Sequence, residues 1–285
     1  MPPLPFVSSE VEKRVRGALR GFSTVLETNG RSVLGITAAL TLAACAAPPA
    51  EVAAPAPPPP VAAPTVAIAP PPIVARTPVA LCGRGSVALT SDGRLLNHFP
   101  YPGVSESVLL PAPPPLDDGG ACRVHPAMLG DLNRLIAASN ADPAVAGKLR
   151  SVSCHRGVAF QAQTFCAGIL SGRSMGFRDR AWASAPPGYS EHATGYVVDF
   201  GTTDRGGCPD ADACFAATPV GKWLIANAAR YGFEMSFPAG NKQQMKWEPW
   251  HWRWVGTSAA VPGATAARAT FSQARKAFPA RPRPE

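Results

Sequence analysis

Several features that mark common classes of protein are missing from this sequence. No two of its seven cysteines are spaced as C-x-x-C, which disfavours a zinc–thiolate site. The net charge of +8 is not gathered into a basic stripe interleaved with aromatic residues, which argues against nucleic acid as a partner. The chain also shows no internal repeat, and this excludes a repeat architecture. Only five histidines are present, so each is a notable candidate for chemistry.

An apolar run near the N-terminus, from Val33 to Leu42, is too short to span a bilayer as a lone helix, which needs about 20 residues. Basic residues precede this run, and alanines surround Cys45 just after it. This order is typical of a secretory signal, and its end resembles a bacterial lipobox, in which the cysteine is lipidated. We therefore predict a signal peptide with lipobox at residues 1–45 and lipidation of Cys45. The alternatives are an ordinary cleaved signal and an uncleaved anchor.

Proline is the unusual abundant residue, and many of the 33 prolines lie between Pro48 and Pro78. A segment rich in proline and alanine forms neither helix nor sheet ladder, so residues 46–79 are predicted to be an extended linker. Disorder without a spacing role is the alternative.

The cysteines that remain after Cys45 form an even set of six, as expected for an exported protein with three disulfides. Their pairing is not determined by the sequence, although Cys208 and Cys214 close the shortest loop. The six are Cys82, Cys122, Cys154, Cys166, Cys208 and Cys214.

Periodicity and breaker residues predict an α+β fold: a small, mostly antiparallel sheet with flanking helices and a metal site in a central cleft. We expect helices near 126–136, 158–170 and 219–230, and strands near 148–153, 195–200 and 250–255. The folded domain is predicted to span residues 80–257. Residues 258–285 are expected to form a basic C-terminal tail, with a helix in its first part.

Two clusters contain residues suited to metal chemistry. One holds His192 and Asp199, and the other holds Glu248 and His251. Two imidazoles and one carboxylate are a known ligand set for catalytic zinc, because three protein ligands leave the fourth tetrahedral position for water. Glu248, the additional carboxylate, can then act as general base.

Each motif is weak when taken alone. A His-x6-Asp pair and a Glu-x-x-His triplet both occur by chance. The tryptophans around His251 also allow a packed core strand in which His251 is simply hydrogen-bonded. These tryptophans are Trp247, Trp250, Trp252 and Trp254.

Taken together, the run S-x-H-x-x-G-x-x-x-D and the later E-P-W-H-W-R resemble the VanY-type D-alanyl-D-alanine carboxypeptidases. These belong to a wider group of zinc peptidases that includes lysostaphin-like and Hedgehog-type folds. The resemblance implies His192, Asp199 and His251 as zinc ligands and Glu248 as general base, in agreement with the chemical argument.

An upstream family stretch, S-G-Y-R-S-x-x-x-Q, corresponds here to Ser153 through Gln161. The resemblance therefore implies that Arg156 binds substrate or stabilises the oxyanion, a role that suits its planar guanidinium. It also implies that Gln161 and Ser190 hold the end of the peptide. A surface or structural role for Arg156 is the alternative.

This sequence departs from the family pattern at two positions, where Cys154 and His155 replace a glycine and an aromatic residue. We expect an altered pocket wall, with Cys154 available for a disulfide and His155 either lining the pocket or packed, rather than binding metal. His98 and His125 are expected to be loop or helix-cap residues. Glu191 is expected to face solvent or to hydrogen-bond within its loop.

The leading hypothesis is zinc-dependent removal of the C-terminal D-alanine from peptidoglycan stem peptides. One alternative is an endopeptidase that cuts wall cross-links by the same chemistry, and another is a non-catalytic, zinc-containing lipoprotein that binds the wall. The expected partners are peptidoglycan peptides and the membrane, through the lipid anchor. We expect a monomer in the periplasm of a Gram-negative bacterium, anchored at the outer membrane.

Overall fold

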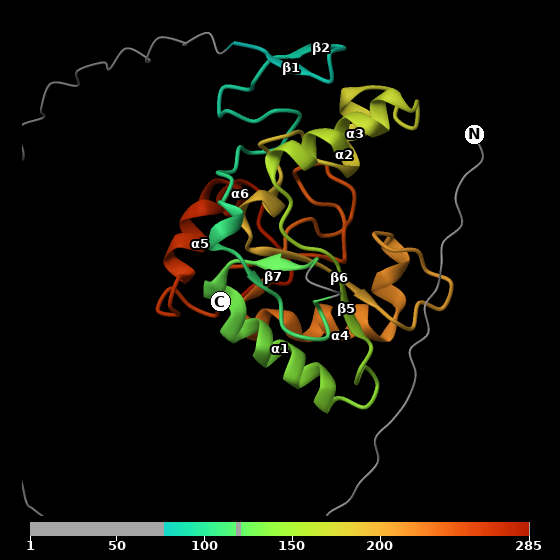
Figure 1. Ribbon diagram of the computed structural model, residues 1–285, viewed down its shortest axis with the longest axis vertical. Helices are drawn as coiled ribbons and strands as arrows, with labels where there is room; N and C mark the ends of the chain where they lie inside the picture. The colour runs from blue at the N-terminus through green and yellow to red at the C-terminus, as the bar shows by residue number, and fades with distance from the viewer. Residues whose placement is uncertain (1–76, 118–120, 285) are drawn as a thin grey trace, which may run out of the picture. The chain divides into compact units, whose positions relative to one another are not determined.

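A four-stranded antiparallel sheet lies at the centre of the computed structural model, which describes residues 77–117 and 121–284 (Figure 1). The strand order is β5-β6-β8-β7. The strands are β5 (Leu149–Ser153), β6 (Val197–Thr202), β8 (His251–Trp254) and β7 (Phe233–Met235). The predicted signal peptide, Cys45 and most of the predicted linker lie outside the described residues.

Two short hairpins precede or flank this sheet. The first pairs β1 (Val79–Leu81) with β2 (Gly85–Val87), and the second pairs β3 (Leu110–Pro111) with β4 (Arg123–Val124). The first described strand thus begins at Val79, close to residue 80, the predicted start of the domain.

Helices flank the sheet on more than one side (Figure 1). They are α1 (Leu129–Ala141), α2 (Val158–Leu170), α3 (Phe177–Ala183), α4 (Pro219–Asn227), α5 (Ala264–Thr270) and α6 (Ser272–Ala277). Short 3₁₀ helices cover Glu106–Val108, Pro126–Met128, Glu191–Thr194, Ala213–Ala217 and Ala228–Tyr231. The predicted α+β fold, with a small antiparallel sheet and flanking helices, is confirmed. None of the helices in the described ranges has the length and apolar character needed to cross a membrane.

The alternation of side chains along β8 separates the core from the polar side of the sheet. Trp252 and Trp254 are fully buried in the main hydrophobic core, and the indole nitrogen of Trp254 donates a hydrogen bond to Asp131 of α1. His251 and Arg253 alternate with them and therefore point to the opposite face. The tryptophan-rich strand is thus a core strand on one face and a polar site on the other.

Three disulfides join the six cysteines, as the even count predicts. The pair Cys208–Cys214, expected from its short loop, is present. The other two pairs, Cys82–Cys166 and Cys122–Cys154, connect segments that are distant in the sequence.

The C-terminal segment differs from its prediction as a basic tail. Residues 258–284 include α5 and α6, and the side chains of Ala264, Ala267, Phe271 and Ala274 are buried in the main core. Small alanine side chains let these short helices approach the sheet closely, and Phe271 fills the space between them and the aromatic core. The predicted domain, residues 80–257, is therefore extended by a packed C-terminal cap formed by α5 and α6.

Candidate metal centre

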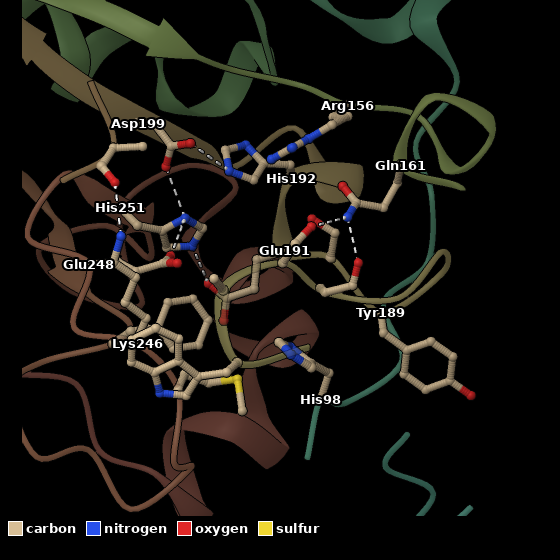
Figure 2. A pocket seen from close by; sticks show the side chains of 18 of the residues that line it. His98, Arg156, Gln161, Tyr189, Glu191, His192, Asp199, Lys246, Glu248 and His251 are labelled. Atoms are coloured by element: carbon tan, nitrogen blue, oxygen red, sulfur yellow. Dashed lines mark hydrogen bonds and ion pairs between the residues drawn. The ribbon is translucent and has the colours of Figure 1, made fainter. Parts of the chain in front are cut away.

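His192, Asp199 and His251 converge at the sheet, although they come from three separate elements (Figure 2). Asp199 on β6 is paired directly with His251 on β8, so the two side chains share one face. His192 belongs to the 3₁₀ turn before β6. His192 Nε2 lies 3.1 Å from Asp199 Oδ2, and His251 Nδ1 lies 3.0 Å from Asp199 Oδ1. The three ligand atoms lie within 4.8 Å of one another, close enough to bind one ion.

Gly195 allows the chain to turn between His192 and Asp199. It ends the 3₁₀ turn with a φ of 73°, a backbone conformation that favours glycine. A Cβ atom there would also lie 2.6 Å from a methyl carbon of Leu109. The glycine in the motif is thus required both by the turn and by the close packing against it.

The outer nitrogen of each imidazole is held by a fixed acceptor. His192 Nδ1 lies 2.6 Å from the carbonyl oxygen of Cys154, and His251 Nε2 lies 3.0 Å from Glu191 Oε2. A carbonyl oxygen or carboxylate accepts one N–H of the ring, so the opposite nitrogen is the one that can bind a metal, for His251 after its second proton has left. His192 Nε2 and His251 Nδ1 are thereby turned toward Asp199, the arrangement typical of metal-binding histidines.

The charges at the centre are strongly coupled. Burial lowers the pKa of His192. For His251, burial acts in the same direction, but hydrogen bonds to Asp199 and Glu191 outweigh it and raise the pKa to about 10. Although burial alone would raise the pKa of Asp199, the two histidines hold it well below its usual range. The site therefore presents an ionised carboxylate to a cation.

Glu248 lies at the edge of this cluster, with Oε2 3.8 Å from His251 Nδ1. Its backbone N–H donates to the carbonyl of Phe237 and fixes the approach to β8. Burial, together with the nearby Asp199 charge, raises the pKa of Glu248 to about 8, against the opposing effect of His251. A carboxyl group that titrates near neutral pH is suited to general acid–base chemistry.

The remaining expected site residues line the same cavity as the metal cluster. These are Arg156, Gln161 and Ser190. The guanidinium of Arg156 points toward His192 (Figure 2), while its backbone N–H donates to the His192 carbonyl. Gln161 is buried, and its amide nitrogen donates to the carbonyl of Ala185. With Cys45 left aside, the seven site residues predicted from the sequence therefore all line one cavity.

Two buried polar atoms in this cavity wall have no hydrogen-bond partner within the described residues. They are Nε of Arg156 and Oε1 of Gln161. Buried polar atoms are rarely left unpaired, and such atoms at a cavity call for a ligand or water. Trp182, half exposed, and Lys246, whose ammonium lies 5.0 Å from the Trp250 ring centre, complete the rim.

Glu191 is the main residue that the sequence analysis undervalued. The residue is 4% exposed, so the expectation that it faces solvent is wrong, and its carboxylate hydrogen-bonds to distant segments instead of within its own loop. It accepts hydrogen bonds from Tyr101, Ser236, His251 and Arg253. Its position beside His192 was the only local signal for this role.

The other histidines divide into three cases. His155 does not line the cavity and is half-buried, so the alternative of a packed residue holds for it, and Cys154 contributes through its disulfide and its carbonyl. His125 caps a 3₁₀ helix as expected, since its Nδ1 accepts from the Ala127 N–H. His98 is more than a loop residue: it is buried, donates to the carbonyl of Ala181 and lines the cavity.

Comparisons with known proteins point to one family. Residues 121–257 match the family model described as VanY, D-alanyl-D-alanine carboxypeptidase. The putative carboxypeptidase YodJ of Bacillus subtilis (strain 168) is 39% identical over 87 residues, which are 30% of this chain and 31% of YodJ. A D-alanyl-D-alanine carboxypeptidase of Enterococcus faecium is 36% identical over 73 residues, 25% of this chain and 22% of the relative. The matches thus span less than a third of either relative.

The solved structure of the LdcB LD-carboxypeptidase is also similar. It aligns with a TM-score of 0.49 and 25% sequence identity, over 61% of this chain and 82% of that structure.

Proposed function

We propose that this protein uses zinc to remove the C-terminal D-alanine from peptidoglycan stem peptides. The match of residues 121–257 to the VanY family model supports this proposal. The observation that carries the proposal is the convergence of His192, Asp199 and His251 beside Glu248 in one cavity. No serine or cysteine nucleophile is needed for this chemistry.

The donor set fits zinc. Two imidazole nitrogens oriented by hydrogen bonds and one ionised carboxylate oxygen are a standard three-ligand set, and a fourth position is left for water. When bound, zinc polarises a carbonyl group and lowers the pKa of its water toward about 7. Harder ions such as magnesium prefer more oxygen ligands than the described cluster offers.

Glu248 is placed to move protons. Its carboxylate lies next to the ligand nitrogen of His251, where it can accept a proton from an attacking water. The same carboxyl group can then pass the proton to the leaving D-alanine nitrogen. Its raised pKa suits both halves of this exchange near neutral pH.

Arg156, Gln161 and Ser190 bind and orient the peptide end in this proposal. Arg156 offers a planar pair of donors that suits the terminal carboxylate or the oxyanion that forms during attack. Gln161 has an unpaired acceptor oxygen in the cavity wall, which suits a peptide N–H. These three roles follow from the family motif and the shared cavity.

The proposed setting is the periplasm, with the chain anchored by lipid at Cys45 in the outer membrane. Three disulfides support an oxidising compartment. The proposed substrate, peptidoglycan, lies in the same place.

The test is to incubate the full chain with a pentapeptide ending in D-Ala-D-Ala, with zinc or with a chelator, and to determine product masses. Loss of a single alanine only when zinc is present supports the proposal. Cleavage of cross-linked muropeptides in place of the pentapeptide would favour the endopeptidase. Zinc binding without cleavage of either substrate would favour a wall-binding module.

A further inference from the structure

A row of buried charged side chains leads away from the metal ligand His251. Glu191 Oε2 accepts from His251 at 3.0 Å, and Glu191 Oε1 accepts from Arg253 Nη1 at 2.6 Å. Arg253 Nε then donates to Glu234 at 2.7 Å, and Glu234 accepts from Arg275 Nε at 3.0 Å. We call Glu191, Arg253, Glu234 and Arg275 the charge chain. It connects the metal cluster to helix α6.

The charge chain is both buried and balanced. Side-chain exposure is 3% for Glu191, 2% for Arg253 and 1% for Glu234, and it rises only to 23% at Arg275. Two carboxylates and two guanidiniums sum to zero charge. Because an unpaired buried charge is costly, loss of one member leaves its neighbours with an excess charge and drives them to rearrange.

The C-terminal segment supplies the last member of the charge chain and also packs against the others. Phe271, between α5 and α6, lies under the guanidinium of Arg253, with 5.2 Å from the Arg253 Cζ to the ring centre. The same ring contacts Tyr101, whose hydroxyl donates to Glu191 at 3.1 Å. This segment follows the family match, which ends at residue 257. The contact therefore comes from residues beyond the matched part of the chain.

We infer that Arg275 is a positioning residue for the metal centre, acting from outside the family domain. By pairing with Glu234, it lets Arg253 hold Glu191 in the orientation that accepts the Nε2 proton of His251. That hydrogen bond keeps the His251 ring turned so that Nδ1 faces the metal position (Figure 2). The inference rests on the proposed zinc site and adds that the C-terminal cap sets its affinity.

The experiment measures the zinc dissociation constant of the full chain by competition with a chromophoric chelator. Arg275→Ala is expected to weaken zinc binding about tenfold, the lower end of the range for groups that orient a ligand. Arg268→Ala is the matched control. Arg268 lies on α5 and donates to the backbone carbonyls of Val255 and Gly256, so it ties down the same segment without joining the charge chain. The zinc dissociation constant of the Arg268→Ala variant should lie within about twofold of the wild-type value.

A double-mutant cycle separates positioning from general loosening of the fold. With Glu234→Gln already present, the Arg275→Ala change should have little further effect on zinc affinity, because the charge that it balances is gone. Arg275→Lys, which keeps the cation, should recover part of the affinity. Thermal unfolding of the metal-free variants establishes that each is folded during the measurement.

The outcomes are distinct for the two proposals. Wild-type protein that binds zinc and cleaves the pentapeptide, with Arg275→Ala unchanged in zinc affinity, overturns the inference alone. Equal losses in Arg275→Ala and Arg268→Ala also overturn it, since packing of the segment would then be the cause. Wild-type protein that neither binds zinc nor cleaves overturns the proposed function and this inference with it.

Discussion

The Nδ1 atom of His192 lies 2.6 Å from the carbonyl oxygen of Cys154, a residue that a disulfide joins to Cys122. The hydrogen bond determines which ring nitrogen carries the proton, and the disulfide restrains the backbone that offers the carbonyl. The main-chain carbonyl of a disulfide-bonded cysteine thus orients the candidate metal ligand His192. The two histidine ligands are oriented by different means: a backbone carbonyl for His192, and the carboxylate of Glu191 for His251.

This relationship predicts that removing the Cys122–Cys154 disulfide weakens zinc binding. The double change Cys122→Ser with Cys154→Ser should raise the zinc dissociation constant by a few-fold to about tenfold, because the carbonyl that orients His192 gains freedom. Competition with a chelator measures this value.

The matched control for that prediction is Cys208→Ser with Cys214→Ser, which removes a disulfide outside the metal cavity. It should leave the zinc dissociation constant close to that of the wild-type protein. Equal affinities for all three proteins would contradict the proposed role of Cys154.

Glu248 is predicted to act in turnover without holding the metal. Glu248→Gln keeps the size of the side chain but removes the base, so kcat should fall by about a hundred- to ten-thousand-fold. Zinc content after dialysis should stay at the wild-type level, because the ligand set does not include this residue. Turnover of the pentapeptide and metal analysis of the same sample provide the check. Near-normal turnover would show that another group is the base.

The sequence predicted those parts of the site that depend on local pattern. His192 and Asp199 are separated by one turn that Gly195 permits, and the periodic segment 158–170 coincides with α2. The strand positions of Asp199 and His251 could also be anticipated, because both lie on apolar, strand-like runs, whereas their direct pairing is a long-range contact. Local spacing and strand alternation are sufficient for these features.

Other features depend on contacts that no local pattern encodes. Glu191 receives its hydrogen bonds from Tyr101, Ser236 and Arg253, which are 90, 45 and 62 positions away. Helix α3 has seven residues and β7 has three, too few for a period to emerge. The alanine- and arginine-rich C-terminus reads as a basic tail because its packing depends mainly on small side chains, with Phe271 and Phe278 as its large aromatic contacts.

Arg156 is predicted to recognise the free carboxylate of the substrate. Arg156→Gln should lower kcat/KM for the acid by about ten- to a hundredfold, as expected for loss of a charged hydrogen bond worth about 1.5–3 kcal/mol. For a peptide with a C-terminal amide, the same substitution should lower kcat/KM much less. Kinetics with the matched acid and amide peptides measure both values.

A control variant and the pattern of losses distinguish the possible roles of Arg156. Arg173→Gln, at an exposed position after α2, removes the same charge away from the cavity lining and should leave both substrates unaffected. Equal losses of kcat for the acid and amide peptides in Arg156→Gln would instead assign Arg156 to the oxyanion. No loss with either peptide would make it a structural arginine.

His98 is predicted to make the protein sensitive to acid. Burial lowers the pKa of His98 from 6.5 to about 4, because enclosure of the ring outweighs the hydrogen bond from Nε2 to the carbonyl of Ala181, which acts in the opposite direction. Between these values the unfolded chain binds a proton that the folded protein does not, so the free energy of unfolding falls as the pH is lowered from 6.5 to 4. A shift of this size corresponds to about 3 kcal/mol.

His98→Gln keeps a donor near the Ala181 carbonyl but cannot titrate, so it should remove most of that loss. Urea unfolding of the metal-free protein at pH 7 and pH 4.5 measures the difference, and other acidic groups cancel because both proteins share them. His125→Gln is the control, since His125 caps a helix at a half-buried position and should account for a smaller part. The free energy of unfolding could instead fall equally for wild-type protein and His98→Gln between the two pH values. His98 would then bind a proton in the folded protein as readily as in the unfolded chain. Its contact with Ala181 would then survive protonation, and the acid sensitivity would have to come from the carboxylates around the metal centre.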